Sequence, residues 1–89
     1  VEVMRDVVLR TVPISRDDAL SMLAEIRGRR VLDGVRGMPA ADVDALVELM
    51  LAVSRLALAC PGITEIDLNP VIVHAKGLSI VDARMILAG

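Results

Sequence analysis

The chain has 89 residues, which is enough for one domain, and 55% of them are hydrophobic while 25% are charged. There is no Phe, Tyr or Trp, so the chain lacks the aromatic platforms on which single-stranded nucleic acid stacks. The formal net charge of -2 argues against a protein that binds the phosphate backbone of nucleic acid. We therefore expect no nucleic-acid partner.

The single cysteine, Cys60, cannot form an internal disulfide or a zinc site with several thiolates. We expect a buried, reduced thiol and a cytoplasmic protein. No basic stretch precedes an apolar run near the start, so no targeting segment is predicted. The most apolar segment, residues 43–60, contains Asp44, Glu48 and Arg55, which favours a helix of a soluble domain over a membrane span.

The chain begins with Val1 and has more apolar side chains than a core of this size should need. We therefore expect a piece of a longer protein, with part of its surface covered by another domain. In isolation the fragment is expected to self-associate, through the helix at residues 43–59 or through the first strand.

The first predicted element is a strand at residues 3–12, because this segment is rich in β-branched residues and ends at Pro13. A helix should follow, since Ser15 and Asp18 form a capping-box pattern and Gly28 provides an end signal. The apolar stripe of this helix comprises Ala19, Leu20, Leu23 and Ile26. Residues 29–38 contain two glycines and four charged side chains, which predicts a loop.

A second helix is predicted to start at Pro39, whose missing N–H costs nothing at the first helical position. Asp42 and Asp44 then fall in the positive first turn. The inward stripe of this helix comprises Val43, Leu46, Val47, Met50, Val53 and Ala57. Leucines on its other sides make it apolar nearly all round, which is typical of a helix buried on more than one flank.

The hydrophobic period changes to two from Ile63 onward, so the last quarter of the chain is predicted to be a β-hairpin. The element order is then strand, helix, loop, helix, strand, strand. This order predicts an α+β fold in which two helices pack on one face of a small antiparallel sheet. We expect residues 1–89 to form a single domain.

Polar side chains gather on one face of this hairpin. Strand alternation places Glu65, Asp67 and Asn69, the last being the only Asn in the chain, on one face of the first strand. The same rule places Asp82 and Arg84 on one face of the second strand. An even-length loop makes these two polar faces coincide, whereas an odd-length loop would put Asp82 on the other side.

The sequence favours a four-residue loop at residues 74–77, with Gly77 in the left-handed position that ends such loops. In this register Asn69 lies opposite Asp82, with their Cβ atoms about 5 Å apart. A carboxamide oxygen and a carboxylate at that distance suit a hard cation. Magnesium typically takes one or two carboxylates, keeps several waters and completes its shell with substrate phosphates.

Imidazole or thiolate metals are not indicated, because His74 and Cys60 are isolated in the sequence. The competing interpretation of the polar face is a solvated sheet surface with a cross-strand ion pair between Asp67 and Arg84. Charged strand faces are common, so the residue pattern alone leaves both interpretations open.

Four segments, in this order, resemble the C-terminal part of the ATP-grasp domain of NDP-forming acyl-CoA synthetases, relatives of the β subunit of succinyl-CoA synthetase. They are Gly34-Val35-Arg36-Gly37-Met38-Pro39, Asp42-Val43-Asp44-Ala45-Leu46, Glu65-Ile66-Asp67-Leu68-Asn69-Pro70 and Val81-Asp82-Ala83-Arg84. The resemblance covers essentially the whole chain, and its most specific part is the acidic-x-Asn-Pro followed by Asp-Ala-Arg. It implies one lobe of an ATP-grasp domain.

The resemblance also implies the ADP-forming reaction, in which acyl-CoA, ADP and phosphate give the acid, ATP and CoA through an acyl phosphate and a phosphohistidine. Mg²⁺ with ADP or ATP would be the cofactor in the full-length protein, and Asn69 and Asp82 would be the metal ligands. Asp67 occupies the position of a catalytic acidic residue facing the phosphohistidine, which belongs to another domain and is not His74.

Two arginines are candidates for contacts to nucleotide phosphates. Arg36 stands between two glycines, and its alternative role is an ion pair with a nearby acid. For Arg84 the alternative is to brace Asp67. Glu65 is expected to be solvated or to contact a helix.

The parts of such an enzyme that this chain lacks are the N-terminal ATP-grasp lobe and the CoA-binding and phosphohistidine domains. We therefore expect no turnover by the fragment alone. A second hypothesis is a non-catalytic, synthetase-like regulatory or oligomerisation module, for example one fused to a protein acetyltransferase. A third is a small α+β dimerisation domain whose polar hairpin face is indifferent to mutation. The acyl group and the preference for ADP or GDP cannot be deduced from these residues.

Overall fold

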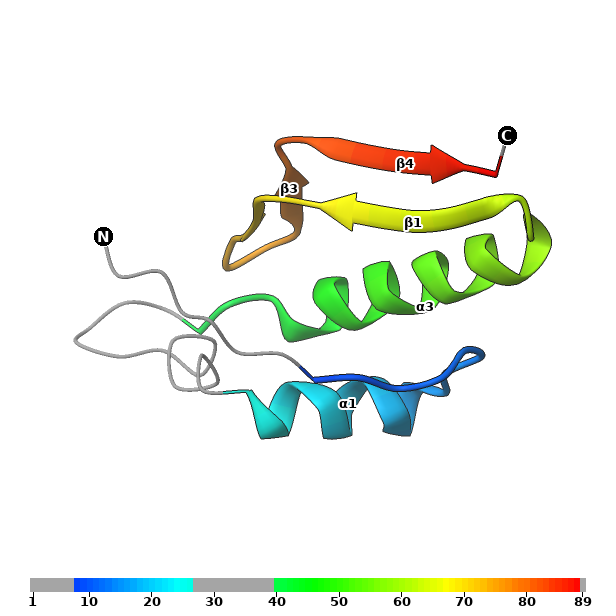
Figure 1. Ribbon diagram of the computed structural model, residues 1–89. Helices are drawn as coiled ribbons and strands as arrows, with labels where there is room; N and C mark the ends of the chain where they lie inside the picture. Colours follow the sequence, from blue (N-terminus) through cyan, green and yellow to red (C-terminus); the bar gives the residue numbers. More distant parts are fainter. Residues whose placement is uncertain (1–7, 27–39, 89) are drawn as a thin grey trace.

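Two helices and four short strands are present in the computed structural model, which describes residues 8–26 and 40–88. The helices are α1 (Arg16–Glu25) and α3 (Val43–Ala59); the strands are β1 (Ile63–Leu68), β2 (Val71–Val73), β3 (Leu78–Ile80) and β4 (Ala83–Leu87). Helix α3 lies between α1 and the strands, and β1 is nearer to α3 than β4 is (Figure 1). The predicted α+β class, with antiparallel strands and two helices, is confirmed.

Helix α1 begins with the predicted capping box. The Ser15 hydroxyl accepts a hydrogen bond of 3.1 Å from the Asp18 N–H, and the Asp18 carboxylate accepts one of 2.8 Å from the Ser15 N–H. These bonds satisfy N–H groups that have no partner within the helix. The helix ends at Glu25, followed by Ile26 in an extended conformation. The predicted end signal, Gly28, lies outside the described residues.

Helix α3 begins later than predicted. Residues 40–42 are not helical, so the start at Pro39 is wrong, and Pro39 itself lies outside the described residues. The N-cap is Asp42, whose Oδ1 accepts a hydrogen bond of 3.0 Å from the N–H of Ala45. A carboxylate that caps the helix must precede the first turn, which moves the start to Val43.

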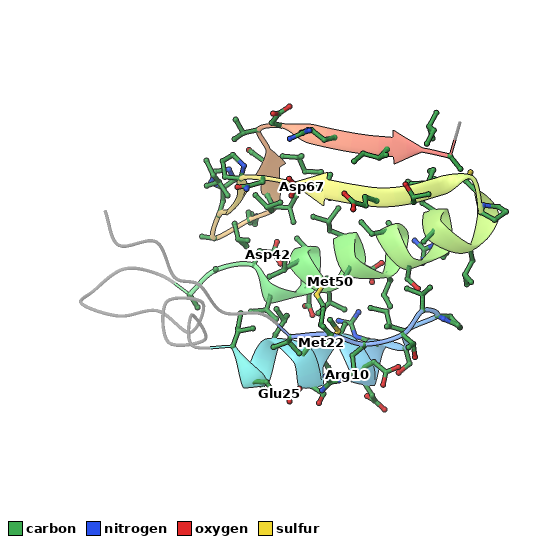
Figure 2. All side chains as sticks on the ribbon, viewed as in Figure 1. Arg10, Met22, Glu25, Asp42, Met50 and Asp67 are labelled. Carbon is green, nitrogen blue, oxygen red and sulfur yellow. The ribbon has the colours of Figure 1, made fainter. Side chains whose placement is uncertain are left out.

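The hydrophobic core lies between the two helices. Its fully buried members are Ala19 and Leu23 of α1 and Val47 of α3, and Met50 packs against them (Figure 2). The other side chains packed on this cluster are Ile14, Ile26, Val43, Leu46 and Leu51. Leu20, predicted to be in the apolar stripe, is 38% exposed, because it lies at the edge of the helix face that carries the buried Ala19 and Leu23.

Charged side chains flank the contact between the helices. Arg16 of α1 forms ion pairs of 2.6 Å with Asp44 and 3.1 Å with Glu48, both on α3. Arg10 pairs with Glu25 at the other end of α1. All of these pairs are exposed, so each contributes little to stability.

The four strands form two separate antiparallel pairs, β1 with β4 and β2 with β3, in place of the single predicted hairpin sheet. The predicted register is nevertheless confirmed within both pairs: Val73 lies opposite Leu78, and Asp67 lies opposite Arg84. The register shifts by one residue only at the far end of β1, next to Ile63.

Two predictions about the ends of elements differ from the structure. The first strand was predicted at residues 3–12. Residues 8–12, the part of it that the structure describes, are not in a strand, and residues 3–7 lie outside the described residues. Cys60 is exposed, not buried, because it caps the C-terminus of α3 and the chain turns there into Pro61 and Gly62. The predicted loop at residues 29–38 also lies outside the described residues.

Within residues 8–26 and 40–88, neither helix is both long and apolar enough to cross a membrane.

Candidate functional site

The candidate site lies where the two strand pairs meet. Here the chain leaves β1 through Asn69 and Pro70 and returns to β4 through Val81 and Asp82. The Asn69 N–H donates a 3.0 Å hydrogen bond to the Asp82 carbonyl, and the Val81 N–H donates one of 3.0 Å to the Pro70 carbonyl. These two bonds hold the crossing strands together, so we call these four residues the junction.

Proline explains why the ladder breaks at this point. Pro70 has no N–H and cannot donate to a neighbouring strand, so a continuous ladder is interrupted there. The two strand pairs therefore change direction at the junction, and in Figure 1 β3 lies across the line of β1 and β4. A change of direction exposes the residues on either side of it. Asn69 and Asp82 are both exposed.

The backbone hydrogen bond from Asn69 to Asp82 makes these two residues neighbours across the junction, in keeping with the predicted hairpin register. One carboxylate oxygen of Asp82 accepts a 2.9 Å hydrogen bond from the N–H of Ala83, which fixes the side chain beside its own backbone. The second oxygen and the Asn69 carboxamide accept no hydrogen bond from any residue within 8–26 or 40–88. A carboxamide oxygen and a carboxylate in exposed, neighbouring positions fit a hydrated Mg²⁺ ion held by two protein ligands.

A tighter, all-protein metal site would need at least three ligating side chains close together. Within the described residues no group of three or more His, Cys, Asp or Glu side chains is placed to hold a metal ion. His74 is exposed in the turn after β2, where its Nε2 lies 2.9 Å from the Ser79 hydroxyl. The groups that the junction itself offers to a metal are the carboxamide of Asn69 and the carboxylate of Asp82.

Asp67 and Arg84 are cross-strand neighbours but are not joined. They are register partners in the β1–β4 pair and both are exposed. No ion pair links their side chains, so the predicted bracing of Asp67 by Arg84 is not observed. Glu65 is also exposed and, two residues before Asp67 in β1, lies on the same face of the strand as Asp67. Figure 2 labels Asp67 on β1. Arg36, the other predicted phosphate contact, lies outside the described residues.

Asp42 is the residue whose role the sequence analysis missed. Beyond capping α3, its Oδ2 accepts a 2.6 Å hydrogen bond from the N–H of Gly77, in the turn between β2 and β3. Its own N–H donates a 2.7 Å bond to the His74 carbonyl. The N–H groups of Gly77 and then Ala45 hold the pKa of the Asp42 carboxyl below its ordinary value of 3.8, against the opposing effect of desolvation.

The preference of Asp for N-cap positions could have identified Asp42 as the start of α3. The bond to Gly77 could not have been found in that way, because it joins residues 35 positions apart in the chain. Its existence depends on where α3 and the strands pack relative to each other.

A family model described as an ATP-grasp domain matches residues 1–87 of the chain. The chain belongs to this family. It is 47% identical, over 98% of its length, to an ADP-forming acetate–CoA ligase from Archaeoglobus fulgidus, and spans 13% of that protein. It is 45% identical, over its whole length, to the β subunit of ADP-forming acetate–CoA ligase II from Pyrococcus furiosus, and spans 39% of that subunit.

This ATP-grasp chain also resembles a solved acetyl-coenzyme A synthetase from Ca. Korarchaeum cryptofilum, with a TM-score of 0.85 and 41% identity. The match covers 88% of this chain and 37% of the solved chain. That protein was solved with coenzyme A and Mg-AMPPCP, its phosphohistidine segment pointing towards the nucleotide-binding site. The resemblance to ADP-forming acyl-CoA synthetases is therefore confirmed, and this chain spans well under half of each of these relatives.

Proposed function

We propose that this chain is the metal-bearing lobe of the ATP-grasp domain of an ADP-forming acyl-CoA synthetase. The complete reaction converts acyl-CoA, ADP and phosphate into the acid, ATP and CoA. The observation that supports the proposal is the junction, where a backbone hydrogen bond makes Asn69 and Asp82 neighbours, in a chain that belongs to the ATP-grasp family.

In this proposal Asn69 and Asp82 hold Mg²⁺ together with the phosphates of ADP or ATP. The metal supplies electrostatic stabilisation of the phosphoryl group as it is transferred. With two protein ligands, the site depends on nucleotide phosphates and water for the rest of its coordination shell. We therefore expect weak metal binding by the chain alone and tighter binding with nucleotide in the complete protein.

Asp67 and Arg84 complete the proposed site on the same side of β1 and β4. Asp67 acts as the catalytic carboxylate and faces the phosphohistidine, which another domain carries. Arg84 is free of Asp67 and is available for a phosphate oxygen, as a guanidinium suits. The same role is proposed for Arg36 on the strength of the family resemblance alone.

Residues 1–89 form one lobe in this proposal, and the nucleotide-binding cleft is completed by an N-terminal ATP-grasp lobe in a cytoplasmic enzyme. The exposed apolar side chains on and beside β4 would be covered by the remainder of the longer protein. The chain spans 13% and 39% of two relatives, which leaves ample polypeptide for this role. Turnover by the isolated chain is not expected.

Magnesium binding tests the metal site directly. In a nuclear magnetic resonance titration of the ¹⁵N-labelled chain, Mg²⁺ should shift the amide signals of Asn69 and Asp82, and Asp82→Asn should abolish these shifts. Glu65→Gln is the matched control, because Glu65 is an exposed acid on the same strand face and outside the junction. Shifts that persist in Asp82→Asn would remove the metal assignment.

Catalysis is tested in the complete protein. Asp82→Asn should abolish nucleotide-dependent formation of acyl-CoA while circular dichroism shows an intact fold, and Glu65→Gln should retain activity. The alternative function is a non-catalytic synthetase-like module. It would be favoured by a wild-type complete protein that binds Mg-nucleotide without turnover, and by a coding sequence that joins this lobe to an acetyltransferase and lacks the phosphohistidine domain.

A further inference from the structure

We propose that Asp42 is a positioning residue that sets the direction of the β2–β3 hairpin and thereby the relative placement of Asn69 and Asp82. The inference rests on the proposed function only for its consequence at the metal site. The geometric part concerns α3 and the strands alone. It follows from where the hairpin is attached at each of its two ends.

Among the polar contacts between residues of 8–26 and 40–88, only those of Asp42 attach the tip of the hairpin to the N-terminus of α3. The carboxylate accepts the 2.6 Å bond from Gly77, and the Asp42 N–H donates the 2.7 Å bond to the His74 carbonyl. A third bond, 2.9 Å from the His74 N–H to the Gly77 carbonyl, closes the turn itself. The turn is therefore held as a unit, and Asp42 ties that unit to the helix.

The base of the hairpin is attached at the junction. Each strand of the hairpin has three residues, so the tip and the base are close, and a movement of one is transmitted to the other. The two junction bonds, from Asn69 to Asp82 and from Val81 to Pro70, are the last hydrogen bonds before the chain enters the β1–β4 pair. A tilt of the hairpin must therefore strain or open these two bonds.

Packing of the hairpin on α3 is the competing explanation. Val71 and Val73 of β2 are half-buried, while Ile72 between them is 48% exposed. Apolar contacts of this kind are non-directional and tolerate a change in angle. Hydrogen bonds to a carboxylate are directional and charge-assisted. For this reason we infer that the hydrogen bonds of Asp42 set the direction of the hairpin, whereas packing of Val71 and Val73 sets only its general location.

Substitution can separate the two tasks of Asp42. In Asp42→Asn the amide oxygen can still cap α3 through Ala45, but the amide NH₂ then faces the N–H of Gly77, donor against donor. Asp42→Ser is the second variant, because Ser is an equally good N-cap whose shorter side chain does not reach the turn. Asp44→Asn is the matched control, since Asp44 lies in the same first turn and bonds Arg16, not the hairpin.

The first measurement is the orientation of the hairpin in the chain, from residual dipolar couplings of the amides in β2–β3 relative to those in β1–β4. Asp42→Asn and Asp42→Ser should change this orientation and should speed hydrogen exchange at the N–H groups of Asn69 and Val81. Helix content by circular dichroism should stay at the wild-type level, and Asp44→Asn should behave as wild type. A wild-type orientation in both Asp42 variants would overturn the proposal.

The second measurement is the affinity for Mn²⁺, read from paramagnetic broadening of the Asn69 and Asp82 amides. Loss of a residue that orients metal ligands typically costs tenfold or more in affinity, so we expect a drop of about tenfold in both Asp42 variants. A changed orientation with unchanged Mn²⁺ affinity would overturn the link to the site. Absence of broadening in the wild type would instead reject the proposed metal site, and the orientation measurement would still decide the role of Asp42.

Discussion

The hydroxyl of Ser54 accepts a hydrogen bond of 3.1 Å from the backbone N–H of Ile14, 40 residues earlier in the chain. Ser54 lies in the middle of α3 and is only 4% exposed, whereas Ile14 immediately precedes the capping box of α1. A polar side chain at a buried helix position thus satisfies a backbone donor that neither helix can satisfy. It also fixes where the chain enters α1.

We therefore expect Ser54→Ala to destabilise the chain. The substitution leaves the part-buried N–H of Ile14 without a partner, which costs about 1–3 kcal/mol. Ser21→Ala is the matched control, because Ser21 is an exposed serine within α1 and the change brings only the small gain in helix propensity. Urea denaturation followed by circular dichroism measures both, and equal midpoints for the two variants would contradict the assigned role.

Stability should decrease at acidic pH through two helix caps. Backbone and side-chain hydrogen bonds from Ser15 hold the pKa of Asp18 below 3.8, and the backbone N–H groups of Gly77 and Ala45 hold the pKa of Asp42 below 3.8 in the same way. Each carboxylate therefore stabilises the fold fully above the unfolded value near 3.8, and this contribution is lost as the pH falls through the lower folded value.

The measurement is the urea midpoint as a function of pH from 7 down to about 2.5, which spans the ordinary carboxyl range. The wild type should lose stability below pH 4, and Asp18→Asn should lose less over the same range. Asp17→Asn, in the same first turn of α1, serves as the control and should follow the wild type. An Asp18→Asn profile parallel to that of the wild type would be inconsistent with the capping box as a source of acid sensitivity.

Gly77 should resist substitution because of its backbone conformation. Its φ of +75° lies in the left-handed region, and a Cβ added there would meet no atom within 4 Å. The expected cost of Gly77→Ala is therefore the backbone strain alone, about 1–2 kcal/mol. Gly62→Ala, which is equally open but not left-handed, should be neutral or slightly stabilising. Equal unfolding free energies for the two variants would refute this explanation.

Asp67 and Arg84 should be neutral for stability. Both are exposed and no ion pair joins them, so Asp67→Asn and Arg84→Gln should each change the unfolding free energy by less than about 0.5 kcal/mol. A double-mutant cycle should show no coupling. In the complete protein the same substitutions should lower acyl-CoA formation, and a loss of activity without loss of stability would support their proposed contacts to the phosphoryl group.

Self-association of the isolated chain should proceed through β4. Among the described large apolar residues, α3 exposes only Leu58, whereas Met85 and Leu87 of β4 are 51% and 67% exposed. The sequence suggested the helix at residues 43–59 or the first strand as the surface for self-association. These exposures favour β4 over that helix as the contact surface. Sedimentation should show a concentration-dependent oligomer that the double variant Met85→Lys, Leu87→Lys disrupts and Leu58→Lys does not. A wild-type chain that stays monomeric at high concentration would contradict the predicted self-association.

The site was predictable to the extent that it depends on local rules. Strand alternation and an even-length turn were enough to place Asn69 opposite Asp82. The break at Pro70 was visible in the sequence, but its effect on the direction of the strands was not. The contact between Asp42 and Gly77 was out of reach, since it depends on how α3 packs against the strands.

The same distinction applies to the core. The capping box of α1 follows from Ser15 and Asp18 and is observed as predicted. Ser54 is a polar residue within an apolar helix, which by pattern alone favours exposure, yet it is only 4% exposed and its hydroxyl accepts a hydrogen bond from the distant N–H of Ile14. A polar residue in an apolar stripe can indicate such a partner, but the sequence does not say which one.

The cap of α3 has a consequence for the order in which the molecule assembles. One carboxylate oxygen of Asp42 accepts a hydrogen bond from the N–H of Ala45, three positions later in the chain. The other accepts one from the N–H of Gly77, 35 positions later. On a ribosome, the first half of this cap can form while the strands are still inside the exit tunnel. The second half can close only after Gly77 has emerged, so the start of α3 is completed by a turn that is synthesised 35 residues later.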